Sequence, residues 1–123
     1  MKIYDLIKMK TIFVPYYNDK LSAALSYKIF KLCNLIEQEE QFYNQKMQEI
    51  IDEFGEKSDG KFVTDNNGNV KIIADRIDDA HKAINELRDI EVDTPNIVFT
   101  LDELSEIKLS VMDMVALEEL IKE

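Results

Sequence analysis

Residues that break or constrain a polypeptide are scarce in this chain. Its 123 residues include three glycines, two prolines, one cysteine and one histidine, and no tryptophan. So few turn-forming residues indicate long helices. A single cysteine excludes an internal disulfide, and one histidine with one cysteine falls short of the several ligands that a zinc site takes. We therefore predict no metal and no cofactor.

Long apolar runs are also missing. No run approaches the roughly 18 residues that a membrane-spanning helix needs. The start, Met1 to Asp5, has charged residues every few positions and lacks the continuous apolar stretch of a signal peptide. No Asn-x-Ser/Thr site is present. These features, with the single cysteine, predict a protein of a reducing cytoplasm that does not bind membranes.

Positive charge is scarce as well, with 15 Lys and Arg against 25 Asp and Glu, a net charge of −10. The charge is divided unevenly: residues 1–36 carry +4, from six lysines and two aspartates, and residues 37–123 carry −14. Such an acidic body repels polyanions, which disfavours direct binding to nucleic acid. It favours a partner protein with a basic surface.

Periodic apolar residues predict helices over residues 19–54, 75–89 and 110–122. The first contains no glycine or proline, but a polar stretch at residues 37–41 leaves open a bend that would divide it into two packed helices. In the last helix, Ser110 and Asp113 match a capping box.

Strand signals are short. Residues 61–73 predict a β-hairpin, because the Asn67-Gly68 pair suits the two positive-φ positions of a type I′ turn. Residues 11–14 are β-branched and aromatic, which makes a short strand plausible before Pro15.

The predicted fold is mostly α with a small β element (α+β). Residues 1–18 form an N-terminal arm, and residues 19–123 form a single helical domain in which the long helix packs on the two shorter ones. The predicted core consists of Leu25, Ile29, Leu32, Ile36, Tyr43, Ile50, Phe54, Ile77, Ile84, Leu87, Phe99, Leu104, Met114, Leu117 and Leu120.

The length of the first helix has a consequence for assembly. About 35 residues at 1.5 Å each span roughly 50 Å, more than the diameter of so small a domain. Part of its apolar stripe would then need another molecule to cover it. We therefore expect a homo-oligomer that self-associates through Leu25, Ile29, Leu32 and Ile36.

Candidate sites for chemistry are isolated residues. Cys33 has His81 as its only candidate base, far away in sequence. Three aspartates at residues 75, 78 and 79 could hold a divalent cation, but they equally suit the first turns of a helix. We therefore predict no catalytic residues and no enzyme activity. Lysines and aromatic residues of the first 31 residues would suit either a single-stranded nucleic acid or an amphipathic arm.

Carboxylates crowd the second half of the long helix. They form either a solvated face or a docking surface for a basic protein. The predicted partner-binding residues are Glu37, Glu39, Glu40, Glu49, Asp52, Glu53 and Glu56.

The order of these segments resembles that of small uncharacterised proteins from phages and prophages of low-GC Gram-positive bacteria. Such proteins have a basic start, a long helix with glutamates and an aromatic residue, a short polar insert and a closing helix. The matching stretches are residues 28–32, 37–44, 51–57 and 84–92, and the tail from Leu109. The resemblance implies a mobile-element context, and with it a protein of the host bacterial cytoplasm, and it supplies no catalytic residues.

Three functions follow as hypotheses. The first is a non-enzymatic phage or prophage protein that acts by protein–protein interaction, an acidic, anti-CRISPR-like inhibitor of a host nucleic-acid-binding or defence protein. The second is a virion structural or assembly protein, suggested by the long helix. The third is a small enzyme or nucleic-acid binder that uses the basic N-terminal residues.

Overall fold

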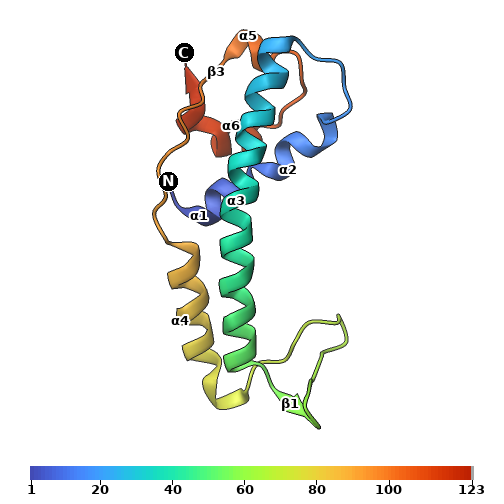
Figure 1. The fold of residues 1–123 in the computed structure, drawn as a ribbon, viewed down its shortest axis with the longest axis vertical. Coiled ribbons are helices and arrows are strands. Elements are labelled where there is room, and N and C mark those ends of the chain that lie inside the picture. Colours follow the sequence, from blue (N-terminus) through green and yellow to red (C-terminus); the bar gives the residue numbers. More distant parts are fainter. Residues whose placement is uncertain (123) are drawn as a thin grey trace.

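One long helix forms the spine of the molecule in the computed structural model, which describes residues 1–122. This helix, α3 (Ala23–Phe54), has 32 residues, about 48 Å at 1.5 Å per residue. The Ser22 hydroxyl caps its start by accepting a hydrogen bond from the Leu25 amide. The helix continues through residues 37–41, so the bend that the sequence left open does not occur (Figure 1).

The N-terminal residues pack against the first half of this spine. They form α1 (Ile3–Lys8), α2 (Lys10–Phe13) and a 3₁₀ turn, η1 (Val14–Tyr16). The strand predicted at residues 11–14 is therefore wrong. Instead of a separate arm, residues 1–18 supply core side chains at helical spacing, namely Ile3, Leu6, Met9, Ile12 and Phe13.

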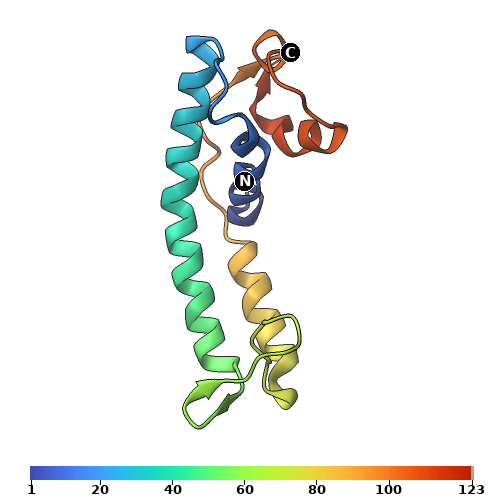
Figure 2. The same ribbon diagram turned by 90° about the vertical axis from the view of Figure 1, so that its right-hand side faces the viewer.

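A second helix runs antiparallel beside the second half of α3 (Figure 1, Figure 2). It begins with the 3₁₀ turn η2 (Ala74–Arg76) and continues as α4 (Ile77–Arg88). The helix predicted at residues 75–89 is thus confirmed to within two residues. Leu87 packs with Tyr43 of α3 and Ile3 of α1 in a small core of its own.

The C-terminal residues close the other end. They form β3 (Phe99–Thr100), α5 (Leu101–Leu104), α6 (Val111–Leu117), the 3₁₀ turn η3 (Glu118–Leu120) and β4 (Ile121–Lys122). The helix predicted to reach residue 122 therefore ends at Leu117. The chain leaves it because Ile121 pairs with Phe99 in a two-stranded parallel sheet.

The β-hairpin lies earlier than predicted. Strands β1 (Lys57–Ser58) and β2 (Lys61–Phe62) pair antiparallel. Asp59 and Gly60 join them with φ values of +53° and +77°, as a type I′ turn requires.

The hairpin predicted at residues 61–73 is partly formed, with one isolated antiparallel bridge between Thr64 and Val70 and a hydrogen bond from the Lys71 amide to the Val63 carbonyl. At its tip only Gly68 has a positive φ, of +82°. The turn is instead held by Asp65, whose carboxylate accepts hydrogen bonds from the amides of Asn67 and Asn69.

Most of the predicted core is confirmed. Ile50, Ile84 and Met114 are half-buried, and Ile77, the first residue of α4, is exposed. Buried residues missing from the prediction include Ile97 and Ile107 of the C-terminal segment, in addition to the five N-terminal ones.

The stripe predicted for self-association lies inside the monomer. Leu25, Leu32 and Ile36 are 0% exposed and Ile29 is 7% exposed. They pack with residues of α1, α2 and the C-terminal segment in one core. These four side chains are therefore unavailable to a second copy, because the chain's own shorter elements cover them.

Candidate functional site

Helix α6 presents an apolar face to solvent. Its Ser110–Asp113 capping box forms as predicted, with both hydrogen bonds at 3.0 Å. Val111, Met112 and Val115 are 80%, 73% and 56% exposed. Their spacing places them on one side of the helix, away from buried Leu117. The short helix therefore buries one apolar stripe and exposes another.

A groove lies alongside this face. It has a volume of about 430 Å³ and is lined by Leu101, Met114, Glu118 and Ile121. Leu101, at the start of α5, is itself 53% exposed. The exposed face of α6 and the groove together form what we call the C-terminal apolar face, defined by Leu101, Val111, Met112, Met114, Val115 and Ile121.

Carboxylates accompany the C-terminal apolar face. Glu118 lines its groove, Glu119 follows in the chain, and Asp102 adjoins Leu101. All three are exposed, and within residues 1–122 none of them forms an ion pair. By contrast, the nearby Glu103 is neutralised by Lys28, 2.6 Å away.

The predicted partner-binding carboxylates do not form a single face. Glu39 and Glu40 are half-buried, and the latter pairs with Lys10 of α2 at 3.3 Å. Glu49 pairs with Lys46 on the same helix. Glu37 is exposed near the middle of α3, well before Glu49 and Asp52 along the helix.

The structure does gather the later carboxylates with a second acidic group. The loop after α3 returns the chain so that α4 begins beside the end of α3 (Figure 1). Arg76 lies between the groups, 3.7 Å from Glu53 and 3.8 Å from Asp79. We call this set the distal acidic end, and it comprises Glu49, Asp52, Glu53, Glu56, Asp75, Asp78 and Asp79. The two acidic groups come together because α4 runs antiparallel beside α3. Neither helix shows this packing in its own sequence, so the sequence alone does not predict the combined group.

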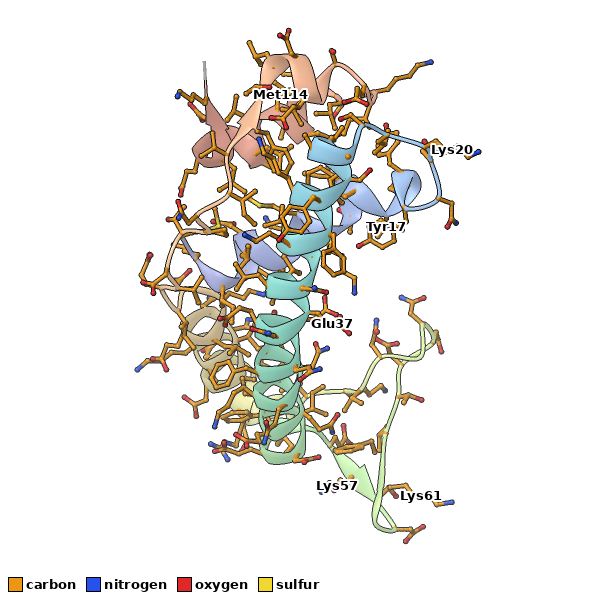
Figure 3. The ribbon with its side chains drawn as sticks, turned by 45° about the horizontal axis from the view of Figure 1, so that its top comes forward. Tyr17, Lys20, Glu37, Lys57, Lys61 and Met114 are labelled. Atoms are coloured by element: carbon orange, nitrogen blue, oxygen red, sulfur yellow. The ribbon has the colours of Figure 1, made fainter. Side chains whose placement is uncertain are left out.

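A pocket of about 480 Å³ opens between residues 16–21 and the first half of α3. We call it the tyrosine pocket. One wall holds Tyr16, Tyr17 and Leu21, and the α3 wall holds Ile29, Phe30 and Cys33. Figure 3 shows Tyr17 and Glu37 on the same side of α3.

The hydroxyl of Tyr17 donates a hydrogen bond to the Cys33 sulfur at 3.1 Å. Burial of the phenol is the largest cause that raises the pKa of Tyr17, to about 12, followed by the Cys33 hydrogen bond and the charges of Glu37 and Glu40. Tyr17 is thus a neutral donor at physiological pH.

The other chemical candidates are separated. Cys33 lies in the first half of α3, whereas His81 is exposed on α4, beside the second half. Within the part of the chain that the structure describes, no three His, Cys, Asp or Glu residues are placed to hold a metal ion. No helix in residues 1–122 has the length and apolar character to cross a membrane.

The lysines of the first 31 residues do not form a continuous strip. Lys8, Lys10 and Lys28 pair with Asp5, Glu40 and Glu103. Lys31 lies over the ring of Tyr27, with 5.6 Å between its ammonium nitrogen and the ring centroid. Phe13, one of the aromatic residues counted with them, is buried against Phe99.

Comparisons with known proteins supply no relative. No protein-family model, curated protein or solved structure matches the chain. The surfaces described above are therefore the basis for a functional proposal.

Proposed function

We propose that the chain is a non-enzymatic protein that binds a partner protein with a basic surface, and that the C-terminal apolar face is its anchor. The observation that carries this proposal is the exposure of Val111, Met112 and Val115 on one side of a seven-residue helix. Contiguous exposed apolar side chains mark interaction sites in soluble proteins. Valine and methionine in such a position gain free energy when a partner covers them.

The carboxylates beside this face support a basic partner. Asp102, Glu118 and Glu119 have no cation to neutralise them within residues 1–122. A second copy of the chain would bring carboxylates against carboxylates, which costs free energy. Lysines or arginines around an apolar patch would complement them instead.

The distal acidic end has a different proposed role. Of its seven carboxylates, Glu53 and Asp79 pair with Arg76 and Glu49 pairs with Lys46, and the chain as a whole carries −10. Exposed charges of this kind increase the association rate with an oppositely charged partner more than they lengthen the lifetime of the complex. We propose that this end steers the partner and that α6 retains it.

Proteins that bind nucleic acid carry basic surfaces of the kind required. Together with the resemblance to phage and prophage proteins, this supports an anti-CRISPR-like inhibitor of a nucleic-acid-binding or defence protein in the host cytoplasm. The alternative is a virion structural or assembly role, which the length of α3 suggests. The burial of Leu25, Ile29, Leu32 and Ile36 within the chain leaves less of that helix for neighbouring molecules, so we favour the inhibitor.

A capture experiment tests the proposal. The wild-type chain and the variant Val111→Ser/Met112→Ser/Val115→Ser are immobilised and exposed to lysate of a Gram-positive host at low and high salt. The wild type should retain a basic nucleic-acid-binding protein at low salt and capture less of it at high salt, where screening removes the charge attraction but leaves the apolar anchor. The variant should lose it at both. The matched control Tyr27→Ser/Phe42→Ser also removes exposed apolar side chains and should retain the partner.

A captured protein must then pass a second test. Adding the wild-type chain should displace nucleic acid from the purified partner, as a shared basic surface requires. Capture that survives the α6 variant would contradict the proposed anchor. Absence of any salt-sensitive basic partner, or a complex that leaves nucleic-acid binding intact, would contradict the inhibitor function.

A further inference from the structure

The tyrosine pocket is separate from the surfaces proposed for partner binding. It lies between residues 16–21 and the first half of α3, and none of its lining residues belongs to α6 or to the distal acidic end. Its volume of about 480 Å³ falls within the range of about 300–1,000 Å³ that is typical of small-molecule sites.

The walls of the pocket are mainly apolar and aromatic. Tyr16 and Tyr17 come from the segment before α3, and Phe30 comes from α3 itself. Leu21 and Ile29 complete the apolar lining. The π faces of aromatic rings carry partial negative charge, so they attract cations as well as apolar groups.

The polar groups of the pocket favour one sign of ligand charge. Asp19 and Glu37 line the pocket, are exposed and have no ion-pair partner within residues 1–122. Lys10 also lines it, but its ammonium group is neutralised by Glu40 at 3.3 Å. Lys20 points away from α3 (Figure 3). Two carboxylates therefore remain uncompensated.

The negative charge also acts on the Tyr17 wall of the pocket. Burial and the Cys33 hydrogen bond are the larger causes that raise the pKa of the Tyr17 hydroxyl, and the charges of Glu37 and Glu40 raise it further. Its proton is directed at the Cys33 sulfur. A ligand would therefore meet uncharged aromatic walls with carboxylates close by.

We infer that the tyrosine pocket binds a small organic cation. Its apolar or aromatic body would lie between Tyr17 and Phe30, and its ammonium or guanidinium group would lie beside Glu37. An anion of the same shape is repelled by Asp19 and Glu37. A neutral molecule of that shape gains the apolar contacts without the charge attraction.

Three probes of nearly equal shape test this inference on the full chain: phenylpropylamine, phenylpropanol and phenylpropionate. Nitrogen–proton correlation NMR spectra follow each titration. Affinity should fall in the order amine, alcohol, carboxylate. The backbone amide shifts should be largest at Tyr17, Phe30 and Cys33.

Two variants separate the contribution of the Glu37 charge to ligand affinity from that of the Phe30 ring. Glu37→Gln keeps the shape and removes the charge, so it should weaken the amine by roughly three- to fivefold and leave the alcohol unchanged. Phe30→Ala should weaken both, and it should fold because Phe30 is 59% exposed. Glu53→Gln, the matched control at the distal acidic end, should change neither.

Several results would overturn the inference. These are carboxylate binding equal to that of the amine, shifts that map outside the pocket, an unchanged amine affinity in Glu37→Gln, or no binding of any probe. A blocked arginine peptide that bound more tightly than the amine would reassign the pocket to a side chain of a protein partner. Because these measurements need no protein partner, they are independent of the capture experiment above.

Discussion

Lys28 Nζ lies 2.6 Å from Glu103 Oε1, and this ion pair joins the spine helix to the C-terminal segment. The same glutamate oxygen accepts hydrogen bonds from the amide and the hydroxyl of Thr100, which completes the capping box of α5. One side chain thus starts a helix and fastens it to α3. The hydrogen bond from Lys28 is the largest cause that lowers the pKa of Glu103.

Replacing Glu103 should therefore remove two contributions at once. Glu103→Ala should lower the free energy of unfolding by about 1–2 kcal/mol, from a lost cap and a partly exposed ion pair. Lys28→Met removes only the ion pair and should cost at most about 1 kcal/mol. Urea denaturation of the two variants and the wild type measures both values. Equal losses of unfolding free energy in Glu103→Ala and Lys28→Met would show that the capping hydrogen bonds of Glu103 contribute nothing to stability.

The stability that Glu103 supplies should depend on pH. Its pKa is lower in the folded chain than the ordinary value of 4.5, so the folded state releases this proton more readily than the unfolded state. The contribution is therefore present above pH 4.5 and is lost as the pH falls through the folded pKa. The difference in unfolding free energy between wild type and Glu103→Gln should shrink in acid. A difference that stays constant on acidification would contradict this assignment.

The stripe of α3 that carries Leu32 should behave as monomer core. Leu32 is 0% exposed, and Leu32→Ala should cost about 2–5 kcal/mol. Phe30→Ala, on the exposed side of the same helix, should change the unfolding free energy by only about 0.5 kcal/mol. Denaturation at two protein concentrations distinguishes a Leu32 buried within the monomer from a Leu32 buried between subunits. In the second case the loss of unfolding free energy would depend on protein concentration.

The parts of the fold predicted correctly are those specified by local signals. Helix periodicity and the Ser110 capping box depend on residues three or four positions apart, so the sequence displays them directly. The exposed face of α6 is not predicted as a site, because the sequence shows that Val111, Met112 and Val115 are apolar but not which side of the helix the rest of the chain covers.

The parts predicted wrongly depend on distant partners. Ile12 and Phe13 suit a strand by propensity, but they are helical because that conformation buries both in a core shared with Phe99. Ile121 leaves its helix to pair with Phe99, more than 20 residues away. The type I′ turn was assigned to Asn67-Gly68, although Asp59-Gly60 was an equally good local signal.

Gly55 should tolerate no side chain, although its φ of −71° is ordinary. A Cβ atom there would lie 2.5 Å from the carbonyl oxygen of Ile51 and 3.0 Å from the ring of Phe62. Backbone at the end of α3 would have to move, so Gly55→Ala should cost about 1–3 kcal/mol. Ser58→Ala, at an exposed position of β1, is the control and should be nearly neutral. Thermal unfolding of both variants compares them, and an undiminished stability of Gly55→Ala would contradict the close approach.

Tyr17 should titrate later than a tyrosine with the ordinary pKa of 10.0, and Cys33 should be part of the reason. Its pKa is raised from 10.0 to about 12, so the folded state holds this proton more tightly than the unfolded state. The resulting stability is present below pH 10 and is lost as the pH rises toward 12.

The ultraviolet absorbance of tyrosinate, taken as the difference between wild type and Tyr17→Phe, measures this titration. Cys33→Ala removes the hydrogen bond to the Cys33 sulfur, so the pKa of Tyr17 should fall. It should stay above 10.0 because burial, the largest cause, remains. Asn34→Ala, also in the lining of the pocket, should leave the titration unchanged. A pKa of Tyr17 that is the same in Cys33→Ala and wild type would mean that burial and the carboxylates alone keep the phenol neutral.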